Sequence, residues 1–500
     1  MAMAKLRRLV RGPRTVREDR LSALSDDLLR LIVSRLEDTR TALSTAVLSR
    51  RWAHIPRELP ALDLKVGDIL PPEYNQTIDL RERNLPGDTG SLDGLMAHWE
   101  LRSTRTFTDS IASLVAAGGS SDGDARRRAK TLRLEFFSAN DGGCIDRLVA
   151  AAVGAWGVDD LEIVARPASS CHHEGNAPAH RFPHDLLDDG GRSRLRSLTL
   201  GNCTLPPLHT YEALTTLVLQ DVAASTPVAV YERLFTDCTR LEVLHLKSCG
   251  CTEDLDHLVV DAPGSAIREL LVEECAFSEI TLHALPMLAR LACLGRTMML
   301  RFGSVPSLTH LNLTFWEDGE PLDFLRKAPA ATTNLVLRFT GPSRWVVPMH
   351  LATPFRGLKR LLVADLPSNW DVSWPRILLF FARSLEVLHI HVAHSDDEPG
   401  EDIWWLNIRK KLRRHRHMKE LVIIGFAPTP RQKLLVKDAL SMCRSLQRLV
   451  LLRDGHVRYN GLWEWEMVGQ PDCPWSADDT MAVTKLINSA SKPLLDVILG

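Results

Sequence analysis

The chain has 500 residues, of which 45% are hydrophobic and 25% charged, and its formal net charge at pH 7 is −1. This composition is typical of globular proteins, and the length allows two or more domains or one extended array. A net charge near zero gives no long-range field for nucleic acid or an acidic membrane surface, and no run approaches the about 18 apolar residues of a membrane-spanning helix, so neither partner is predicted.

Residues 1–18 are rich in lysine and arginine and contain no acidic residue before Glu18. We predict a flexible basic arm here. The segment lacks the apolar stretch of a secretory signal, so an organelle transit peptide and a nuclear signal remain as alternatives.

The stretch LSALSDDLLRLIVSRL, residues 21–36, predicts the first helix. Ser25 is a good N-cap, and Asp26 and Asp27 follow in the first turn, where carboxylates favour the helix dipole. The apolar residues of this helix spread over roughly 200° of arc, twice the stripe of roughly 100° that a surface helix needs. We therefore expect that the helix is fully buried in its own domain, or that one flank packs on its own bundle and the other on another protein.

Residues 65–125 are predicted to form a linker and first helices leading into the repeats described below. The segment GSSDG at 119–123 fits the letters of a G-x-S-x-G nucleophile elbow, but no strand precedes it. The sequence contains neither a phosphate-binding G-x-x-x-x-G-K motif nor an H-E-x-x-H metalloprotease motif. We predict that the chain is not an enzyme and uses no cofactor.

A leucine pattern, Lxx-LxL, recurs along the rest of the chain with an average spacing of about 26 residues, which is typical of leucine-rich repeats. It predicts a horseshoe-shaped solenoid of short strands over residues 126–452, in an α/β fold. The central residues of the pattern, expected to point into the core, are Leu132, Leu161, Leu198, Leu217, Leu244, Leu270, Leu291, Leu311, Leu335, Leu361, Leu388, Leu421 and Leu449.

The residue after each central leucine is expected to line the concave face. This column is largely Val and Leu, which indicates a binding surface for protein unless neighbouring side chains or an inserted loop cover it, and the sequence leaves both alternatives open. The predicted substrate-binding residues on this face are Val218, His245, Leu271, Val336, Leu362, His389 and Val422, and the same column contains Asn312 and Val450.

The ten cysteines form no CxxC pair, which favours reduced thiols. Cys203, Cys249 and Cys275 occupy equivalent repeat positions and are predicted to be buried. A second cluster, Cys171 with histidines up to His184, has enough ligands for zinc but no standard spacing, so we predict no metal site. The basic run RKKLRRHRH at 409–417 is interpreted as a helix on the convex side, with nuclear import or RNA contact as alternatives.

The final segment, residues 453–500, is predicted to cap the solenoid. Trp463, Trp465 and Trp475 are expected to cover the open apolar end of the last repeat rather than to form a ligand site. The stretch GLWEWEMVGQPDCPW at 461–475, with the amphipathic segment and the terminal LLDVILG after it, resembles the FBD-like closing region of cereal F-box proteins.

The N-terminal region 19–64 joins the helix above to two short motifs, VLSRRW at 47–52 and LPALDL at 59–64. With the repeats, this region resembles the F-box of plant F-box/leucine-rich-repeat proteins. The resemblance implies a three-helix domain that docks on a Skp-type adaptor. Ser25 stands where the family usually has Pro, so one adaptor contact of the relatives is missing. Carried over by position, the adaptor-binding residues are Leu24, Leu28, Ile32, Val47, Leu48 and Trp52, any of which is otherwise core of the bundle.

By this resemblance the chain is a substrate-recognition subunit of an SCF-type cullin–RING ubiquitin ligase, located in the nucleus or the cytoplasm. The F-box holds the adaptor and the repeats hold an unidentified target protein. One alternative is a leucine-rich-repeat scaffold that no longer recruits the ligase. Another is a small-molecule, hormone-like receptor on the concave face, with His245, Arg338, Arg360 and His389 as the polar anchors that such a pocket needs.

Overall fold

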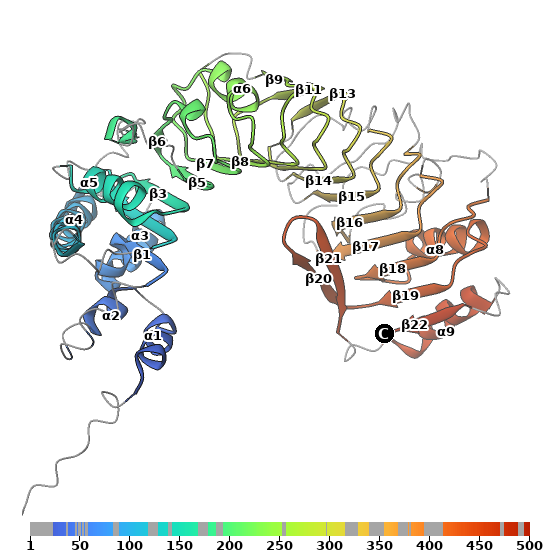
Figure 1. Cartoon of the computed structure of the whole chain (residues 1–500). Helices are drawn as coiled ribbons and strands as arrows, with labels where there is room; N and C mark the ends of the chain where they lie inside the picture. The colour runs from blue at the N-terminus through green and yellow to red at the C-terminus, as the bar shows by residue number, and fades with distance from the viewer. Residues whose placement is uncertain are drawn as a thin grey trace, which may run out of the picture.

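The repeats form one long arc, with two short helices beyond its N-terminal end (Figure 1). The computed structural model describes residues 24–36, 39–45, 48, 52, 55, 59–83, 90–118, 129–138, 143–168, 179–186, 194–252, 257–296, 298–315, 329–339, 355–368, 379, 382–394, 414–470, 475–488 and 495–500.

A continuous parallel sheet lines the inside of the arc. Among the described residues it has fifteen strands, which pair in chain order. These strands are β1 (Ala61–Lys65), β2 (Thr131–Phe137), β3 (Asp160–Arg166), β5 (Ser197–Gly201), β7 (Thr216–Gln220), β8 (Val243–Lys247), β10 (Glu269–Glu273), β12 (Arg290–Gly295), β14 (His310–Phe315), β15 (Asn334–Phe339), β16 (Arg360–Pro367), β17 (Val387–Ala393), β18 (Glu420–Ile424), β19 (Arg448–Leu452) and β22 (Asp496–Leu499).

The strand register confirms the predicted leucine column. All thirteen central leucines are buried, and each lies opposite the next across the sheet, as Leu361 does opposite Leu388. The column also continues at both ends, with Leu62 opposite Leu132 and Val497 opposite Leu449. The sheet therefore begins at Ala61, inside the region assigned to the F-box, and extends past the predicted limits of 126 and 452.

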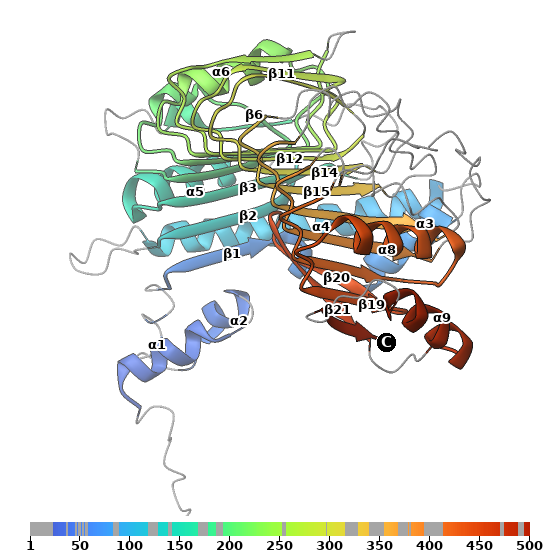
Figure 2. The ribbon, with the colours of Figure 1, turned by 90° about the vertical axis from the view of Figure 1, so that its right-hand side faces the viewer.

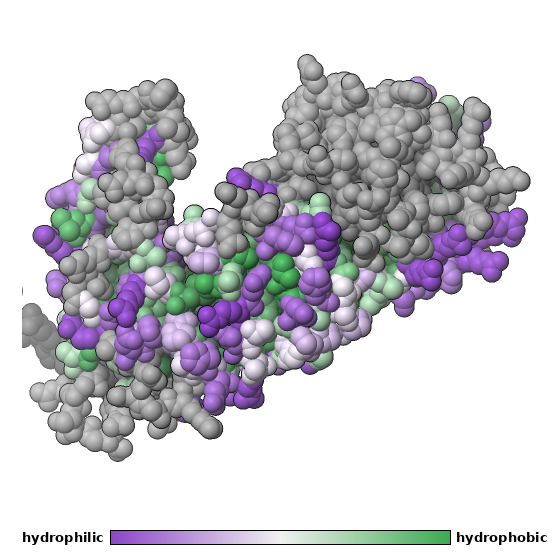
Figure 3. Space-filling model, turned by 90° about the horizontal axis from the view of Figure 1, so that it is seen from above, coloured by the Kyte–Doolittle hydropathy of each residue, from purple (hydrophilic) through white to green (hydrophobic). Residues whose placement is uncertain are grey.

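Helices and short strands cover the outer side of the sheet (Figures 1 and 2). Between β1 and β2 lie η3 (Val66–Ile69), α3 (Pro72–Arg83) and α4 (Gly90–Gly118); between β2 and β3 lie α5 (Cys144–Ala150) and a π-helical turn, η4 (Ala151–Trp156). Further along are β4 (His180–Arg181), η6 (His184–Leu186), β6 (Cys203–Thr204), η7 (Leu208–Thr210), α6 (Val228–Asp237) and α8 (Pro430–Met442). A second sheet pairs β9 (His257–Asp261), β11 (Glu279–Ala284) and β13 (Met299–Ser304). Seen from above, the described residues of this outer side carry small apolar groups among polar side chains (Figure 3).

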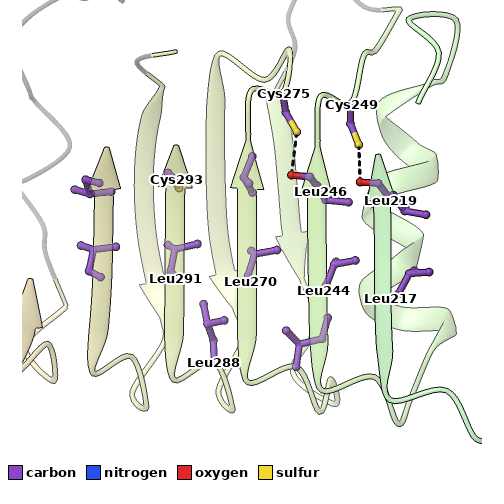
Figure 4. Packing of buried hydrophobic residues seen from close by; sticks show 14 of the residues in the cluster. Leu217, Leu219, Leu244, Leu246, Cys249, Leu270, Cys275, Leu288, Leu291 and Cys293 are labelled. Atoms are coloured by element: carbon purple, nitrogen blue, oxygen red, sulfur yellow. Dashed lines mark hydrogen bonds between the residues drawn. The ribbon is translucent and has the colours of Figure 1, made fainter. Parts of the chain in front are cut away.

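The turn that follows many strands has a repeated left-handed residue. It lies four positions after the central leucine, and its occupants include Asn202, Asp221, Ser248, Gly295 and Gly425, all with positive φ. The next position turns back into the core, where the predicted cysteines lie buried: Cys203, Cys249 and Cys275. Their thiols donate to backbone carbonyls, as the Cys275 Sγ does to Leu246 O at 3.4 Å (Figure 4). Burial raises the pKa of Cys203 to about 12, so this thiol is an inert structural group.

Two helices precede the sheet, α1 (Asp26–Ser34) and α2 (Thr39–Ser44). Ser25 caps α1 as predicted, because its hydroxyl accepts from Leu28 N, and Asp26 and Asp27 occupy the first turn. The Thr39 hydroxyl accepts from Asp63 N at 2.9 Å and so ties α2 to β1. Most of residues 46–58 lie outside the described residues, so the three-helix arrangement implied for region 19–64 stays a prediction.

The C-terminal end of the sheet is covered by β22 and by α9 (Ala477–Asn488), which packs near α8. The prediction that three tryptophans cap this end is wrong for Trp463 and Trp465, which lie on the concave face instead. Trp475 does pack at the end, with its ring centroid 5.6 Å from that of Phe426. No described helix is long and apolar enough to cross a membrane.

We predict that Gly425→Ala destabilises the solenoid. Gly425 has φ 74°, and a Cβ there would lie 2.0 Å from Val392 O. The left-handed conformation alone costs an L-residue roughly 1–2 kcal/mol, and the contact adds to that cost. Urea unfolding should show the loss for Gly425→Ala, while the control Gly264→Ala, with no atom within 4 Å of its Cβ, should leave stability nearly unchanged.

Candidate functional site

The concave face is polar in its N-terminal half and apolar in its C-terminal half. The central outward column, read along the register, begins with Asp63, Arg133, Glu162, Thr199, Val218 and His245. It continues with Leu271, Ala292, Asn312, Val336, Leu362, His389, Val422 and Val450. The change from mainly polar to mainly apolar outward residues falls between β8 and β10.

A hairpin lies against the apolar half of this face (Figure 1). Its strands are β20 (Gly455–Asn460) and β21 (Glu464–Gly469), which pair antiparallel with Tyr459 opposite Trp465. Side chains alternate along it. Val457, Tyr459, Trp465 and Met467 pack against the sheet, while Arg458 and the other outward residues of β20 are exposed.

The inward side chains of the hairpin make three apolar clusters with the sheet. Trp465 packs with Val336, Leu362 and Ala364. Leu462 and Trp463, at the hairpin tip, pack with Leu271, Ala292 and Leu294. Met467 packs with Val422, Ile424 and Val450. The apolar column is thus covered by the chain itself, which decides between the two alternatives that the sequence left open for these positions.

This covering changes the status of the predicted substrate-binding residues. Leu271, Val336, Leu362, His389 and Val422 are buried, each with at most 9% of its surface exposed, so they form no open surface while the hairpin is in place, and their binding of a target stays a prediction. Val218 and His245 are half-buried and lie on strands that the hairpin clusters do not reach. Binding of a partner at these two residues stays a prediction.

His389 anchors the hairpin through a directed hydrogen bond. The indole Nε1–H of Trp465 donates to His389 Nδ1 at 2.9 Å, and His389 Nε2 lies 2.7 Å from Glu420 Oε1. Because Nδ1 accepts, the ring proton of a neutral His389 belongs on Nε2, where it faces the carboxylate. This hydrogen bond holds the pKa of Glu420 below its ordinary value of 4.5.

Two arginines of the sheet also hold the hairpin. Arg360 Nη1 lies 2.9 Å from Glu464 Oε2, and its guanidinium is stacked 4.5 Å from the ring centroid of Trp465. Arg338 lies 5.5 Å over the ring of Tyr459 and is paired with Asp365. Burial and the nearby carboxylate of Asp365 raise the pKa of Tyr459 to about 12, so this side chain remains neutral.

Asp365 makes several polar contacts beneath Tyr459. Besides Arg338, it accepts from His391 Nδ1 at 2.8 Å. Burial acts to raise the pKa of this carboxyl, but the hydrogen bonds from His391 and Arg338 together outweigh burial and hold it below its ordinary value. At the tip, Asn312 Nδ2 donates to Leu462 O at 2.7 Å.

These contacts occupy three of the four polar anchors proposed for a small-molecule pocket, namely Arg338, Arg360 and His389. The fourth, His245, has its Nε2 2.9 Å from Glu269 Oε1, and this hydrogen bond is the main cause that lowers the pKa of Glu269. All four anchors are therefore engaged within the chain.

The first helix presents an apolar flank to solvent. Leu28, Leu31 and Ile32 of α1 are 47%, 52% and 37% exposed, whereas Leu29 and Val33 are buried, and Leu48, which follows α2, is 62% exposed. The helix thus packs with one flank only, as one of the two sequence alternatives predicts. Of the other residues predicted to bind an adaptor, Leu24 is half-buried, Val47 lies outside the described residues, and Trp52, at 3% exposure, belongs to the core.

The remaining predicted motifs fall partly outside the described residues, among them Cys171, His172 and most of the basic run at 409–417. Within the described chain, no group of three or more His, Cys, Asp or Glu is placed to hold a metal ion. Residues 414–417 are not helical, which corrects that part of the convex-helix prediction. His415 is buried and fixed by two backbone groups, at Ala382 O and Met418 N.

Residues 125–459 match the family described as At1g61320/AtMIF1, LRR domain. The chain belongs to this family. It is a plant protein family, and its leucine-rich-repeat domain covers most of the sheet, from β2 through β19 and into β20. An LRR domain supports a protein-binding role. No curated protein matches the chain.

Sequence reasoning missed the hairpin, although a signal was present. Asn460-Gly461 lies between two stretches of alternating apolar residues, which is a strong short-range hairpin signal. The partners of the hairpin had no such signal, because His389 is 76 residues from Trp465 and Asn312 is 150 residues from Leu462.

We predict that acid weakens the hairpin–sheet contact. The pKa of Glu420 is lower in the folded chain than its ordinary value of 4.5, so its contribution to stability is present above that value and is lost as the pH falls through the folded pKa. Glu420→Gln should lower stability at about pH 7 and have little effect at about pH 3. Urea unfolding at both pH values checks this, and an equal loss at both would contradict it.

We also predict that Trp465→Phe weakens hairpin packing by roughly 1 kcal/mol or more, because it keeps an aromatic ring but removes the Nε1–H that His389 accepts. Tryptic cleavage after Arg458 should then be faster than in the wild type. The control His456→Gln, at an exposed position of β20, should leave the cleavage rate near that of the wild type.

Proposed function

We propose that the chain is a non-catalytic substrate-recognition subunit of an SCF-type ubiquitin ligase, with an F-box that binds a Skp-type adaptor and repeats that bind a target protein. The observation that carries the proposal is the half-packed first helix. Its buried flank, Leu29 and Val33, belongs to the main hydrophobic core, while Leu28, Leu31 and Ile32 remain exposed. Exposed large apolar residues gathered on one flank are typical of a protein-docking surface.

In this proposal the chain supplies no acid, base or metal to the reaction. It raises the local concentration of a target lysine near the charged conjugating enzyme, and proximity alone accounts for its effect. The nucleus or the cytoplasm is the corresponding location. The alternative function, a repeat scaffold without ligase recruitment, draws on the same protein-binding role of the LRR domain and differs only at the first helix.

Binding to a purified Skp-type adaptor distinguishes the two functions. We expect the full chain to retain the adaptor in a pulldown at micromolar concentrations. Leu28→Ala with Ile32→Ala should reduce retention at least tenfold, because it removes two exposed apolar side chains from the docking flank while leaving Leu29 and Val33 in the core.

The control is Leu101→Ala, which truncates a leucine of α4 that is 52% exposed, much as Leu28 is. This variant should bind the adaptor as the wild type does. Absence of adaptor binding by the wild-type chain, with no change in the double variant, would remove the ligase function and leave the scaffold.

A further inference from the structure

The hairpin β20–β21 lies where the repeats have their most apolar surface. The outward positions of β10 to β19 include Leu271, Val336, Leu362, Val422 and Val450, whereas the same column on β1 to β3 is charged. Apolar side chains on the solvent side of a sheet are stable only when something covers them. In the described structure the cover is the hairpin.

The hairpin is attached to the solenoid without being part of its core. It forms a two-stranded sheet of its own and is not a member of the fifteen-stranded sheet. Its apolar residues belong to three small clusters that are separate from the main core, and the main core is closed at its end by β22 opposite β19. Departure of the hairpin would therefore uncover the concave face and leave the solenoid core closed.

The hairpin is joined to β19 by a short link, and each of its strands has a glycine at the base. Two residues, Arg453 and Asp454, link β19 to β20, and Gly455 and Gly469 lie opposite each other at the base. Gly455 has φ 147°, a conformation that L-residues rarely adopt. A rotation at this base moves the whole hairpin as a unit, since its own hydrogen bonds run between β20 and β21.

The side chains of the hairpin define what the covered surface recognises. Trp465 inserts an indole among Val336, Leu362 and Ala364 and donates to His389. Met467, two residues on, meets the next apolar cluster, and the Glu464 carboxylate reaches Arg360. The surface thus accepts an extended segment that carries a carboxylate, an indole and an aliphatic side chain at i, i+1 and i+3.

We propose that the hairpin occupies the target-binding surface of the repeats, and that a target displaces it by presenting an extended segment of this same chemistry. The inference deepens the target-binding half of the proposed function and is independent of the adaptor half. An isolated two-stranded hairpin is only marginally stable, so the hairpin loses its order when a competitor takes its place. The competition also sets a minimum affinity for a target. A target binds only if its contacts with the surface are at least as favourable as those that the hairpin already makes.

Hydrogen exchange on the full wild-type chain tests whether the hairpin opens by itself. We expect amides of β20 and β21 to exchange at least about tenfold faster than those of β17 and β18, because local opening is less costly than unfolding of the sheet. Equal rates for the two sets would mean that the hairpin leaves only on global unfolding, which would overturn the proposal.

A labelled peptide of residues 453–470 tests the surface directly. It should bind the full chain carrying Trp465→Ala with Met467→Ala at least about tenfold more tightly than the wild-type chain, because that variant holds its own hairpin weakly. His456→Ala, at an exposed position of β20, is the control and should bind the peptide no better than the wild type.

The peptide with Trp465→Ala should fail to bind any of the three chains. If the double variant keeps the wild-type circular dichroism spectrum and binds the peptide no better than the wild-type chain, the proposal is overturned. If the double variant does not fold, the hydrogen-exchange rates of the wild-type chain decide whether the proposal holds. Adaptor retention by the same preparations is scored separately, so failure of the adaptor proposal is distinguishable from failure of this one.

Discussion

The structure depends on the stacking of leucines between successive parallel strands. Each repeat supplies a strand whose central leucine is buried by the equivalent residues of its neighbours, as Leu335 is buried between Leu311 and Leu361. A single repeat cannot bury this face, so each repeat is stable only in the array. The column runs without a break from Leu62 to Val497 and fixes the direction of every side chain on the other face of the strands.

Because these directions are fixed, the outward residues alone decide which part of the concave face is polar and which part is apolar. The inward leucines are nearly uniform, so the outward residues are free to vary without loss of the core. On β1 to β3 they are charged, and Arg133 pairs with Glu162 at 3.2 Å. In the C-terminal half they are apolar and need a cover. The hairpin supplies it with aromatic side chains and a small number of directed polar contacts, of which the Trp465–His389 hydrogen bond is the most buried.

Two apolar surfaces of the chain therefore differ in how accessible they are to a partner. The flank of α1 with Leu28, Leu31 and Ile32 is apolar and exposed, whereas the apolar part of the concave face is filled by the chain itself. A partner of the first surface meets an open patch. A partner of the second has to compete with residues that are covalently tethered beside the site, where their effective concentration is high. The two proposed binding events therefore differ in what limits them.

The sequence by itself determined the repeat, the leucine column, the buried cysteines and the start of the first helix. These features depend on spacing within about 10 residues or on regular recurrence, which a periodic pattern records directly. Only the tertiary structure decided that β1 and β22 extend the sheet, and that Trp463 and Trp465 lie on the concave face and not at the end of the solenoid. Those outcomes depend on contacts such as that of Asn312 with Leu462, 150 residues apart. A hydrophobic residue needs burial but does not specify its neighbour, so the choice between two apolar surfaces is made by the geometry of the folded chain.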